Sequence, residues 1–316
     1  MRHLLPLLGV LLCLAGCQTI RVFEDTEPKL LFSDGKLTEG PAVDEQGYLY
    51  FSDQPNDVIR RISPAGKVEV FLEPSGVTNG MAFDRQGRLL MCQSNEGNYP
   101  ENPEAAQRRI ARREKNGRIT VLADAYEGQP FIGPNDLCLD RQGRIYFTDP
   151  YYPESGVEKS QPVSGVYRID PDGKVTRVVS DLQKPNGILI SHDQQYIYIS
   201  DRGTQQLHRY FVEDDGSLTH QDIIYTFADR GIDGMAMDRQ GLIYGAAGTG
   251  KTTGVYVVDP EKKRVVGFKP FAATAFNVCF GGEEERTLYV CSGGSVYAME
   301  VQNRGWVLPH RTLSDR

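Results

Sequence analysis

The sequence predicts an all-β fold, a six-bladed β-propeller with four strands per blade. Three observations support this prediction. A unit of two short apolar strands around a D-x-Q-G-like turn occurs six times, successive units start 40 to 56 residues apart, and further strand-like runs follow most copies. Four strands per unit at this period are typical of a propeller, in which each unit forms one blade.

Each copy opens on a residue that carries a side-chain oxygen. These residues are Glu39, Asn79, Asn135, Asn186, Asp233 and Asn277. An apolar strand then leads into a turn whose Gly suits a left-handed backbone, and a second strand returns. In the third copy the next two strands are GVYRID and KVTRVV, joined by the turn Pro171-Asp172-Gly173.

The last copy has a clear third strand, SVYAMEV, but only a weak fourth. The early run PKLLFSD, residues 28–34, is a spare strand near the other end of the chain. We therefore predict that this N-terminal strand completes the last blade and closes the ring. No linker or low-complexity stretch divides residues 28–316, which predicts one propeller domain.

The N-terminus is a targeting segment. Arg2 and His3 precede an apolar run that is too short to span a bilayer comfortably, and small residues follow it. The ending LAGC resembles a bacterial lipobox, which implies a signal peptide over 1–16, a lipid on Cys17 and a tether over 17–27. Because Gln18 follows rather than Asp, we expect an exported lipoprotein in the outer membrane, facing the periplasm. Ordinary secretion, with Cys17 present by chance, is the alternative.

The composition excludes some partners. The chain carries a net charge of −7 and has no basic runs, which argues against nucleic acid and against anionic membrane surfaces. We expect membrane contact through the lipid anchor only. The four cysteines of the body, Cys92, Cys138, Cys279 and Cys291, lack C-x-x-C spacing and lie in strand-like runs, so buried free thiols are predicted although export permits disulfides.

Residues 245–252, GAAGTGKT, match the phosphate-binding loop of nucleotide hydrolases. That loop requires a helix after it, whose N-terminus faces the phosphates. Here the chain continues as GVYVVDPEKKR, which is typical of another strand. We therefore interpret the motif as a surface loop at the mouth of the channel. Its Lys251 could contact a substrate or simply be solvated.

The six opening residues suggest a metal site, because the first strand of each propeller blade lines the central channel. Glu39, Asn135, Asn186 and Asp233 are the candidate ligands. Carboxylate and amide oxygens favour Ca²⁺, and Mg²⁺, Mn²⁺ or Zn²⁺ are the other divalent options. Turn capping is the alternative explanation for the Asn residues, but it explains Glu39 poorly.

A second set of residues is expected near the substrate, on the same face as the candidate ligands. The second strand of each copy runs back beside the start of the first, so its end lies at the channel mouth. The candidates for substrate binding are Asn79, Arg108, Arg109, Asp149, Tyr151 and Asn277. The long segment 94–107, SNEGNYPENPEAAQ, is interpreted as a lid or pocket wall, or as a tolerated insertion.

The motifs resemble those of the gluconolactonase and regucalcin family of six-bladed propellers. The resemblance covers nearly the whole mature chain and rests on EGP at 39–41, GPNDL at 133–137, FTDP at 147–150, KPNG at 184–187 and GIDG at 231–234. It implies hydrolysis of a lactone with a divalent metal.

The family's metal ligands fall on Glu39, Asn186 and Asp233, and more distant six-bladed hydrolases, the paraoxonases and diisopropyl-fluorophosphatase, add an Asn at the place of Asn135. Where animal regucalcins have a substrate-binding Arg, Gly133 stands here. The paired Arg of the bacterial branch is displaced to Arg108-Arg109. The resemblance therefore does not extend to sugar-lactone specificity.

The expected mechanism follows from the metal. The ion would bind the substrate carbonyl oxygen and stabilise the oxyanion as water attacks, and Asp233 or Asp136 would take the proton from that water. Strand alternation would point Asp136 away from the metal unless the chain is irregular there. A non-catalytic binding propeller, and hydrolysis of phosphotriesters or other esters, are the alternatives. Ser–His catalysis is disfavoured, because there is no G-x-S-x-G motif and none of the five histidines falls at a channel position.

Overall fold

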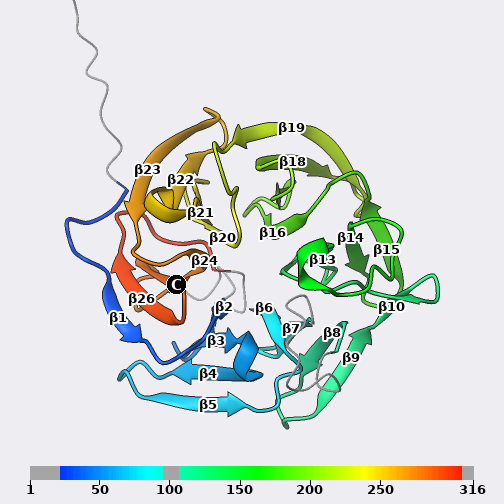
Figure 1. Cartoon of the computed structure of the whole chain (residues 1–316), viewed down its shortest axis with the longest axis horizontal. Helices are drawn as coiled ribbons and strands as arrows, with labels where there is room; N and C mark the ends of the chain where they lie inside the picture. The colour runs from blue at the N-terminus through cyan, green and yellow to red at the C-terminus, as the bar shows by residue number, and fades with distance from the viewer. Residues whose placement is uncertain (1–21, 95–106, 308–316) are drawn as a thin grey trace, which may run out of the picture.

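The computed structural model describes residues 22–94 and 107–307, which form a ring around a central channel (Figure 1). Within these residues the chain forms six four-stranded antiparallel sheets and one two-stranded hairpin. Each sheet is one blade, and its strands run outward from the channel in chain order, except that β1 is the outer strand of the sixth blade. The prediction of a six-bladed propeller is confirmed.

The strands have the following bounds, from the inner to the outer strand of each blade. The first blade contains β2 (Thr38–Val43), β3 (Leu49–Asp53), β4 (Val58–Ile62) and β5 (Val68–Leu72). The second contains β6 (Thr78–Phe83), β7 (Leu89–Gln93), β8 (Arg109–Arg113) and β9 (Ile119–Ala123). The third contains β12 (Leu137–Leu139), β13 (Ile145–Asp149), β14 (Gly165–Ile169) and β15 (Val175–Val179).

The remaining blades follow the same order. The fourth contains β16 (Pro185–Ile190), β17 (Tyr196–Asp201), β18 (Gln206–Val212) and β19 (Leu218–Thr226). The fifth contains β20 (Met235–Met237), β21 (Ile243–Ala247), β22 (Gly254–Asp259) and β23 (Arg264–Pro270). The sixth contains β24 (Ala275–Gly281), β25 (Thr287–Ser292), β26 (Ser295–Glu300) and β1 (Lys29–Phe32), and the extra hairpin is β10 (Ala125–Tyr126) with β11 (Gln129–Pro130).

The two ends of the described chain meet in the sixth blade. Strand β1 pairs antiparallel with β26, with Lys29 opposite Ala298, so the predicted closure by an N-terminal strand is confirmed. The contact extends further back, because Phe23 bridges Val301 and Val22 is only 3% exposed within the core. The packed chain therefore includes Val22 and Phe23, which lie inside the stretch 17–27 that was predicted to be a tether.

The core lies between neighbouring blades. One cluster joins Leu90 and Cys92 of the second blade to Phe147 and Tyr167 of the third, with Phe131 between them. The rings of Phe131 and Phe147 lie 5.0 Å apart in an edge-to-face contact, and burial of such a side chain contributes roughly 1.5–3 kcal/mol. The four body cysteines are free thiols, three buried and one half-buried, as predicted.

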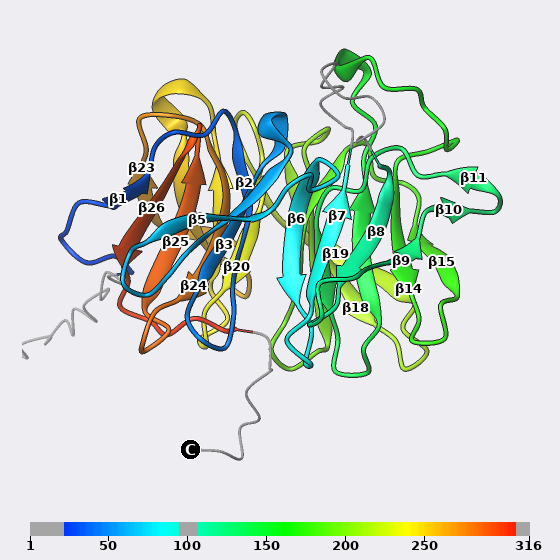
Figure 2. The ribbon, with the colours of Figure 1, turned by 90° about the horizontal axis from the view of Figure 1, so that it is seen from below.

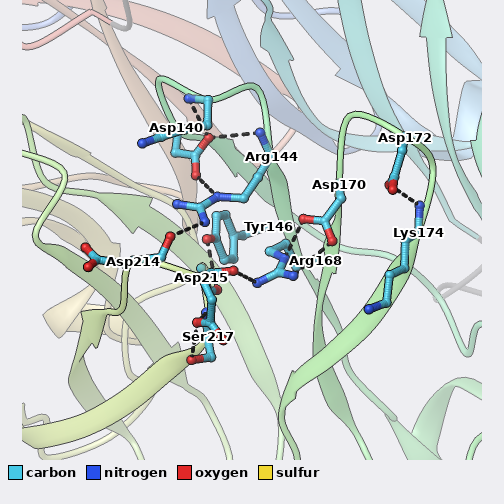
Figure 3. Close-up of polar contacts among 12 residues, drawn as sticks. Asp140, Arg144, Tyr146, Arg168, Asp170, Asp172, Lys174, Asp214, Asp215 and Ser217 are labelled. Atoms are coloured by element: carbon cyan, nitrogen blue, oxygen red, sulfur yellow. Dashed lines mark hydrogen bonds and ion pairs between the residues drawn. The ribbon is translucent and has the colours of Figure 1, made fainter.

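Polar contacts also tie blades together, as between the third and fourth blades (Figure 3). The hydroxyl of Tyr146 donates to the carbonyl of Gly216 at 3.0 Å, and the guanidinium of Arg168 donates to the carbonyl of Asp215 at 2.7 Å. Gly216 has a φ of +80°, a conformation that Gly adopts without a steric penalty. The turn between β18 and β19 is thus held by side chains of the preceding blade.

The two edges of the ring differ. Short 3₁₀ helices follow second strands at the upper edge in Figure 2, as η1 (Gln54–Asn56), η2 (Pro153–Ser155) and η3 (Gly250–Thr252). We call this edge the mouth face, and the D-x-Q-G-like turns lie at the other edge.

The GAAGTGKT motif is not a phosphate-binding loop. After η3 the chain enters β22 directly, so no helix follows the motif, as predicted. Within 22–94 and 107–307, no helix is long and apolar enough to span a membrane.

Candidate active site

The six opening residues of the repeat lie around the channel. The first strands of neighbouring blades contact one another in a closed ring, from β2 through β6, β12, β16 and β20 to β24 and back to β2. The opening residues sit at or just before the start of these strands and all are buried. Their exposed fractions are 5% for Glu39, 3% for Asn79, 3% for Asn135, 2% for Asn186, 4% for Asp233 and 7% for Asn277.

A glycine after the opening residue brings adjacent blades close together. The N–H of Gly80 donates to the carbonyl of Asn135 at 2.8 Å, and a Cβ at Gly80 would lie only 2.7 Å from that oxygen. Gly40, Gly187 and Gly234 likewise pack against the opening residue of the next blade. The repeated N-G and D-G pairs therefore set the spacing of the ring.

The chain is irregular where the ring residues lie. Strand β12 begins only at Leu137 and β20 only at Met235, two residues after each opening residue. Strands β2, β6, β16 and β24 have a register shift at the same place. Strict alternation of side chains is therefore interrupted, and Asp136 is among the residues that border the cavity in the channel. This irregular entry is the condition that the sequence analysis set for Asp136 to act at the site.

The buried carboxylates of the ring influence one another. Burial raises the pKa of Glu39 well above its usual range, and the nearby charges of Asp233 and Asp136 raise it further. Burial raises the pKa of Asp136 to about 7, with Asp233 adding to the effect. The Glu39 carboxylate accepts from the Gly40 N–H at 3.0 Å. Like charges buried this close to one another favour a bound cation.

The donor set fits a cation that prefers oxygen. In the described part of the chain, no three His, Cys, Asp or Glu side chains form a metal-binding group. A metal in the channel would thus use the carboxylates of Glu39 and Asp233 together with the amides of Asn135 and Asn186. The amide nitrogen of Asn186 donates to the hydroxyl of Tyr152 at 2.8 Å, which leaves the amide oxygen for a cation. Such oxygens suit Ca²⁺ better than Zn²⁺.

Two arginines contact Asp233, and sequence reasoning missed both. The same carboxylate oxygen of Asp233 lies 3.4 Å from Arg202 and 3.5 Å from Arg230. The Arg202 side chain is 28% exposed and that of Arg230 is 9% exposed. Arg202 directly follows Asp201, the end of a second strand, so the repeat alone could have predicted that Arg202 lies at the mouth face.

Tyr152 was also missed. It follows the expected residue Tyr151, and its ring lies 5.4 Å from the Lys184 ammonium and 5.8 Å from the Arg202 guanidinium. Because its hydroxyl contacts Asn186, Tyr152 connects the six opening residues around the channel to the cationic side chains of the mouth face.

Asp149 lies beneath the loop that leads to Asn135. Its two carboxylate oxygens accept from the backbone N–H groups of Ile132 and Gly133 at 3.0 and 2.7 Å, and burial raises its pKa to about 7. Asp201 holds the N–H of Lys184 in the same way at 2.8 Å. In both blades the Asp at the end of the second strand positions the loop that carries the opening residue of the same blade.

The other expected substrate residues spread over the ring and the mouth face. Asn277 accepts from the Val278 N–H at 2.8 Å and hydrogen-bonds Glu39, and the carbonyl of Asn79 accepts from Ser52 at 3.1 Å.

At the mouth face, Arg109 donates to Gln93 at 2.5 Å, Arg108 donates to Ser160 at 3.3 Å, and the Tyr151 ring contacts Lys159. Of the expected lid, residues 95–106 lie outside the described residues, as do Cys17 and the signal peptide.

An apolar cavity of about 140 Å³ lies in the channel below the ring. Asp136 and Asn277 border it together with Met81 and Ile188, and the sole tryptophan, Trp306, lines it as well. The backbone N–H of Trp306 donates to the carbonyl of Met237 at 2.7 Å. Trp306 and Val307 thus pack at the end of the channel that lies away from the mouth face.

The chain has extensive similarity to known proteins. A family model described as SMP-30/Gluconolactonase/LRE-like region matches residues 37–294. A gluconolactonase of Zymomonas mobilis is 27% identical over 309 residues, which cover 89% of this chain and 83% of the relative. Lactonase drp35 of Staphylococcus epidermidis is 30% identical over 195 residues, which cover 60% of this chain and 56% of the relative.

Solved structures share the fold. A gluconolactonase from Xanthomonas campestris is 29% identical and superposes with a TM-score of 0.77, covering 89% of this chain and 91% of that one. The calcium-binding protein regucalcin from Agrobacterium tumefaciens has the same fold, with 20% identity, a TM-score of 0.71 and coverage of 93% and 97%. Because the family model spans most of the sequence, this chain belongs to the SMP-30/gluconolactonase/LRE-like family.

Proposed function

We propose that this protein hydrolyses lactones with the help of a divalent metal, for which Ca²⁺ is the best candidate. The observation that carries the proposal is the pair of buried carboxylates of Glu39 and Asp233. They come from the first and fifth blades, both are buried, and the charge of Asp233 is near enough to raise the pKa of Glu39. Relatives that match most or part of this chain are named gluconolactonase and lactonase, which supports the choice of a lactone as substrate.

The residues would have distinct roles. A calcium ion bound by the ring would polarise the lactone carbonyl and stabilise negative charge on its oxygen. Asp136 borders the channel cavity next to the ring, where it would accept a proton from the attacking water. Asp233 is the other candidate for this role, although it is also a candidate ligand. Tyr152 would hold the Asn186 amide so that its oxygen faces the ion.

Paired measurements test the proposal. Hydrolysis of sugar and aliphatic lactones is measured with a chelator and again after Ca²⁺ is restored, and Ca²⁺ binding is measured by calorimetry on the same samples. We expect Glu39→Gln to lose binding and hydrolysis together. Asp136→Asn should retain binding and lose roughly 10²-fold or more in rate, which is the usual size of a general-base contribution.

The control is Lys251→Met, which changes an exposed residue of η3 on the mouth face and should alter neither property. Full lactone hydrolysis in the presence of chelator would contradict the metal role. Bound Ca²⁺ without hydrolysis of any lactone would favour a binding propeller, and hydrolysis of phosphotriesters alone would favour the other class of hydrolase. Loss of Ca²⁺ binding in Asp136→Asn would give Asp136 a supporting role at the metal.

We also propose that the protein is an exported lipoprotein anchored through Cys17 in the outer membrane. The proposal is supported by the sequence LAGC after a short apolar run and by Gln18 at the next position.

A further inference from the structure

One buried residue of the third blade holds the backbone of three residues of the site. Thr148 lies in β13 and is fully buried. Its carbonyl accepts from the N–H of Asn135 at 2.8 Å, and its own N–H donates to the carbonyl of Asp136 at 3.0 Å. Its hydroxyl accepts from the N–H of Asp136 at 3.2 Å and donates to the carbonyl of Asn186 at 2.6 Å. Two candidate ligands and the candidate base are therefore attached to the same residue.

The direction of the hydroxyl contact follows from the distances. A hydroxyl group has one proton and two lone pairs, so it donates to one acceptor and can still accept. The carbonyl of Asn186 lies 2.6 Å from the Thr148 hydroxyl, whereas the carbonyl of Asp136 lies 3.4 Å from it. The proton therefore goes to Asn186, and a lone pair receives the N–H of Asp136. One hydroxyl thus links the entry of the third blade to the entry of the fourth.

Regular strand pairing does not hold these two positions. The pairing of β12 with β13 begins only at Leu137, and the pairing of β16 with β17 is irregular after Pro185. Asp136 and Asn186 lie in these irregular stretches, where further hydrogen bonds must fix the backbone. A buried backbone group that loses its partner is destabilising, because it cannot reach water instead. The Thr148 hydroxyl supplies one such partner to each of the two residues.

The corresponding position of the other blades also carries a small, buried residue. These residues are Ser52, Cys92, Ser200, Ala246 and Cys291. Ser52 donates to the carbonyl of Asn79 at 3.1 Å, so the contact with the opening residue of the next blade also occurs in the first blade. Thr148 is the one β-branched residue of the set. Branching at Cβ restricts rotation about χ1, so the Thr148 hydroxyl is held in one direction.

We propose that Thr148 is a positioning residue, whose hydroxyl sets the placement of the candidate base Asp136 relative to the candidate ligand Asn186. This inference rests on the proposed function, because it concerns the same site. Tyr152 holds the side chain of Asn186, and Thr148 holds its backbone. Loss of a residue that orients a metal ligand typically lowers metal affinity or activity about 10- to 100-fold.

Two substitutions separate the hydroxyl from the shape of the side chain. Thr148→Val keeps the shape and removes the hydroxyl, whereas Thr148→Ser keeps the hydroxyl. Ca²⁺ affinity is measured by calorimetry, and kcat and KM for a lactone are measured at saturating Ca²⁺. We expect Thr148→Val to weaken Ca²⁺ binding about 10-fold and to lower kcat about 10- to 100-fold, with a change in KM below about 3-fold. Thr148→Ser should stay within about 3-fold of the wild type in all three values.

Ser52→Ala is the matched control. It removes a hydrogen bond of the same kind, from a buried hydroxyl to the carbonyl of an opening residue that is not a candidate metal ligand. It should lower the midpoint of urea unfolding, as Thr148→Val should, and leave Ca²⁺ affinity unchanged. If Thr148→Val does not fold, Thr148→Cys takes its place, because two other blades carry Cys at this position. Equal losses of Ca²⁺ affinity in the Ser52 and Thr148 variants, or wild-type affinity and kcat in Thr148→Val, would overturn the assignment.

A double-mutant cycle identifies the group through which Thr148 acts on the rate. Once Asp136→Asn has removed the candidate base, adding Thr148→Val should lower kcat by less than about 3-fold at saturating Ca²⁺. Fully additive losses would refute an action through Asp136. Ca²⁺ binding without hydrolysis of any lactone would refute the lactonase function, and the Ca²⁺ affinities of the Thr148 variants would then decide the assignment alone. A wild type that does not bind Ca²⁺ would overturn both.

Discussion

Gly80→Ala tests whether the close approach of neighbouring blades sets the geometry of the ring. Gly80 directly follows the opening residue of the second blade. A Cβ at this position would lie 2.7 Å from the carbonyl oxygen of Asn135 and 2.5 Å from a carboxylate oxygen of Asp136. The substitution therefore pushes on a candidate metal ligand and on the candidate base, and it removes no polar group from the site.

The size of the effect follows from these distances. An ordinary contact begins at 3.4 Å, so the Asn135 carbonyl must move by about 0.7 Å relative to Gly80. Overpacking of this kind costs about 1–3 kcal/mol in the free energy of unfolding. We expect a cost in the upper half of that range, because the added Cβ meets a backbone carbonyl, which cannot rotate away as a flexible side chain can. Catalytic groups must be held within about 0.5 Å of their productive positions, so the rate of lactone hydrolysis should fall roughly 10- to 100-fold.

The measurements are urea unfolding followed by circular dichroism, Ca²⁺ calorimetry, and hydrolysis on one preparation. The matched control is Gly173→Ala, in the turn between β14 and β15, where a Cβ would have nothing within 4 Å but φ is +89°. That change should cost about 1 kcal/mol through backbone strain alone and leave Ca²⁺ binding and hydrolysis unchanged. Wild-type stability in Gly80→Ala would refute the packing argument, and wild-type activity despite lost stability would show that the ring tolerates the shift.

Three other outcomes are expected. Tyr146→Phe removes the hydrogen bond to Gly216 and should lower the free energy of unfolding by about 1 kcal/mol. Tyr210 has a buried hydroxyl without a hydrogen-bond partner within the described residues, so Tyr210→Phe should leave the free energy of unfolding unchanged. Equal losses for the two variants in urea unfolding would refute the role of the Tyr146 hydrogen bond. Burial, and then the neighbouring His220, lower the pKa of His208, so stability should be fully present above about pH 6.5 and fall as the pH is lowered. His208→Gln should flatten that dependence in unfolding measured between pH 5 and 7, and an unchanged slope would contradict the assignment. Cys17→Ser should yield an unprocessed or soluble protein on cell fractionation, whereas unchanged membrane association would exclude the lipid anchor.

The architecture could be predicted because it is local. Each blade is a succession of hairpins, so the pairing partners lie close in the sequence and the turns carry recognisable residues. The pairing of β1 with β26 was also predictable, because the last unit lacked an outer strand and a spare strand existed near the N-terminus. The ring residues were visible for the same reason, since they occupy one position in a repeat.

The chemistry around the ring depended on the tertiary structure. Arg202, Arg230 and Tyr152 sit in loops after or before strands, where the residue type differs from one repeat to the next, so the repeat does not mark them as functional. Asp149 occupies a repeated position, yet both of its oxygens bind backbone amides of its own blade, and only the path of that loop shows this.

The sequence alone therefore determined the fold, its closure and the six opening residues, because these depend on short-range pairing and on a repeat. The tertiary structure decided which charges meet. Asp233 contacts Arg202 from another blade, and Asp136 borders the channel cavity at the irregular entry that precedes β12. Such contacts depend on how blades rotate about the axis and on where each strand starts, and the sequence pattern of a single blade contains neither.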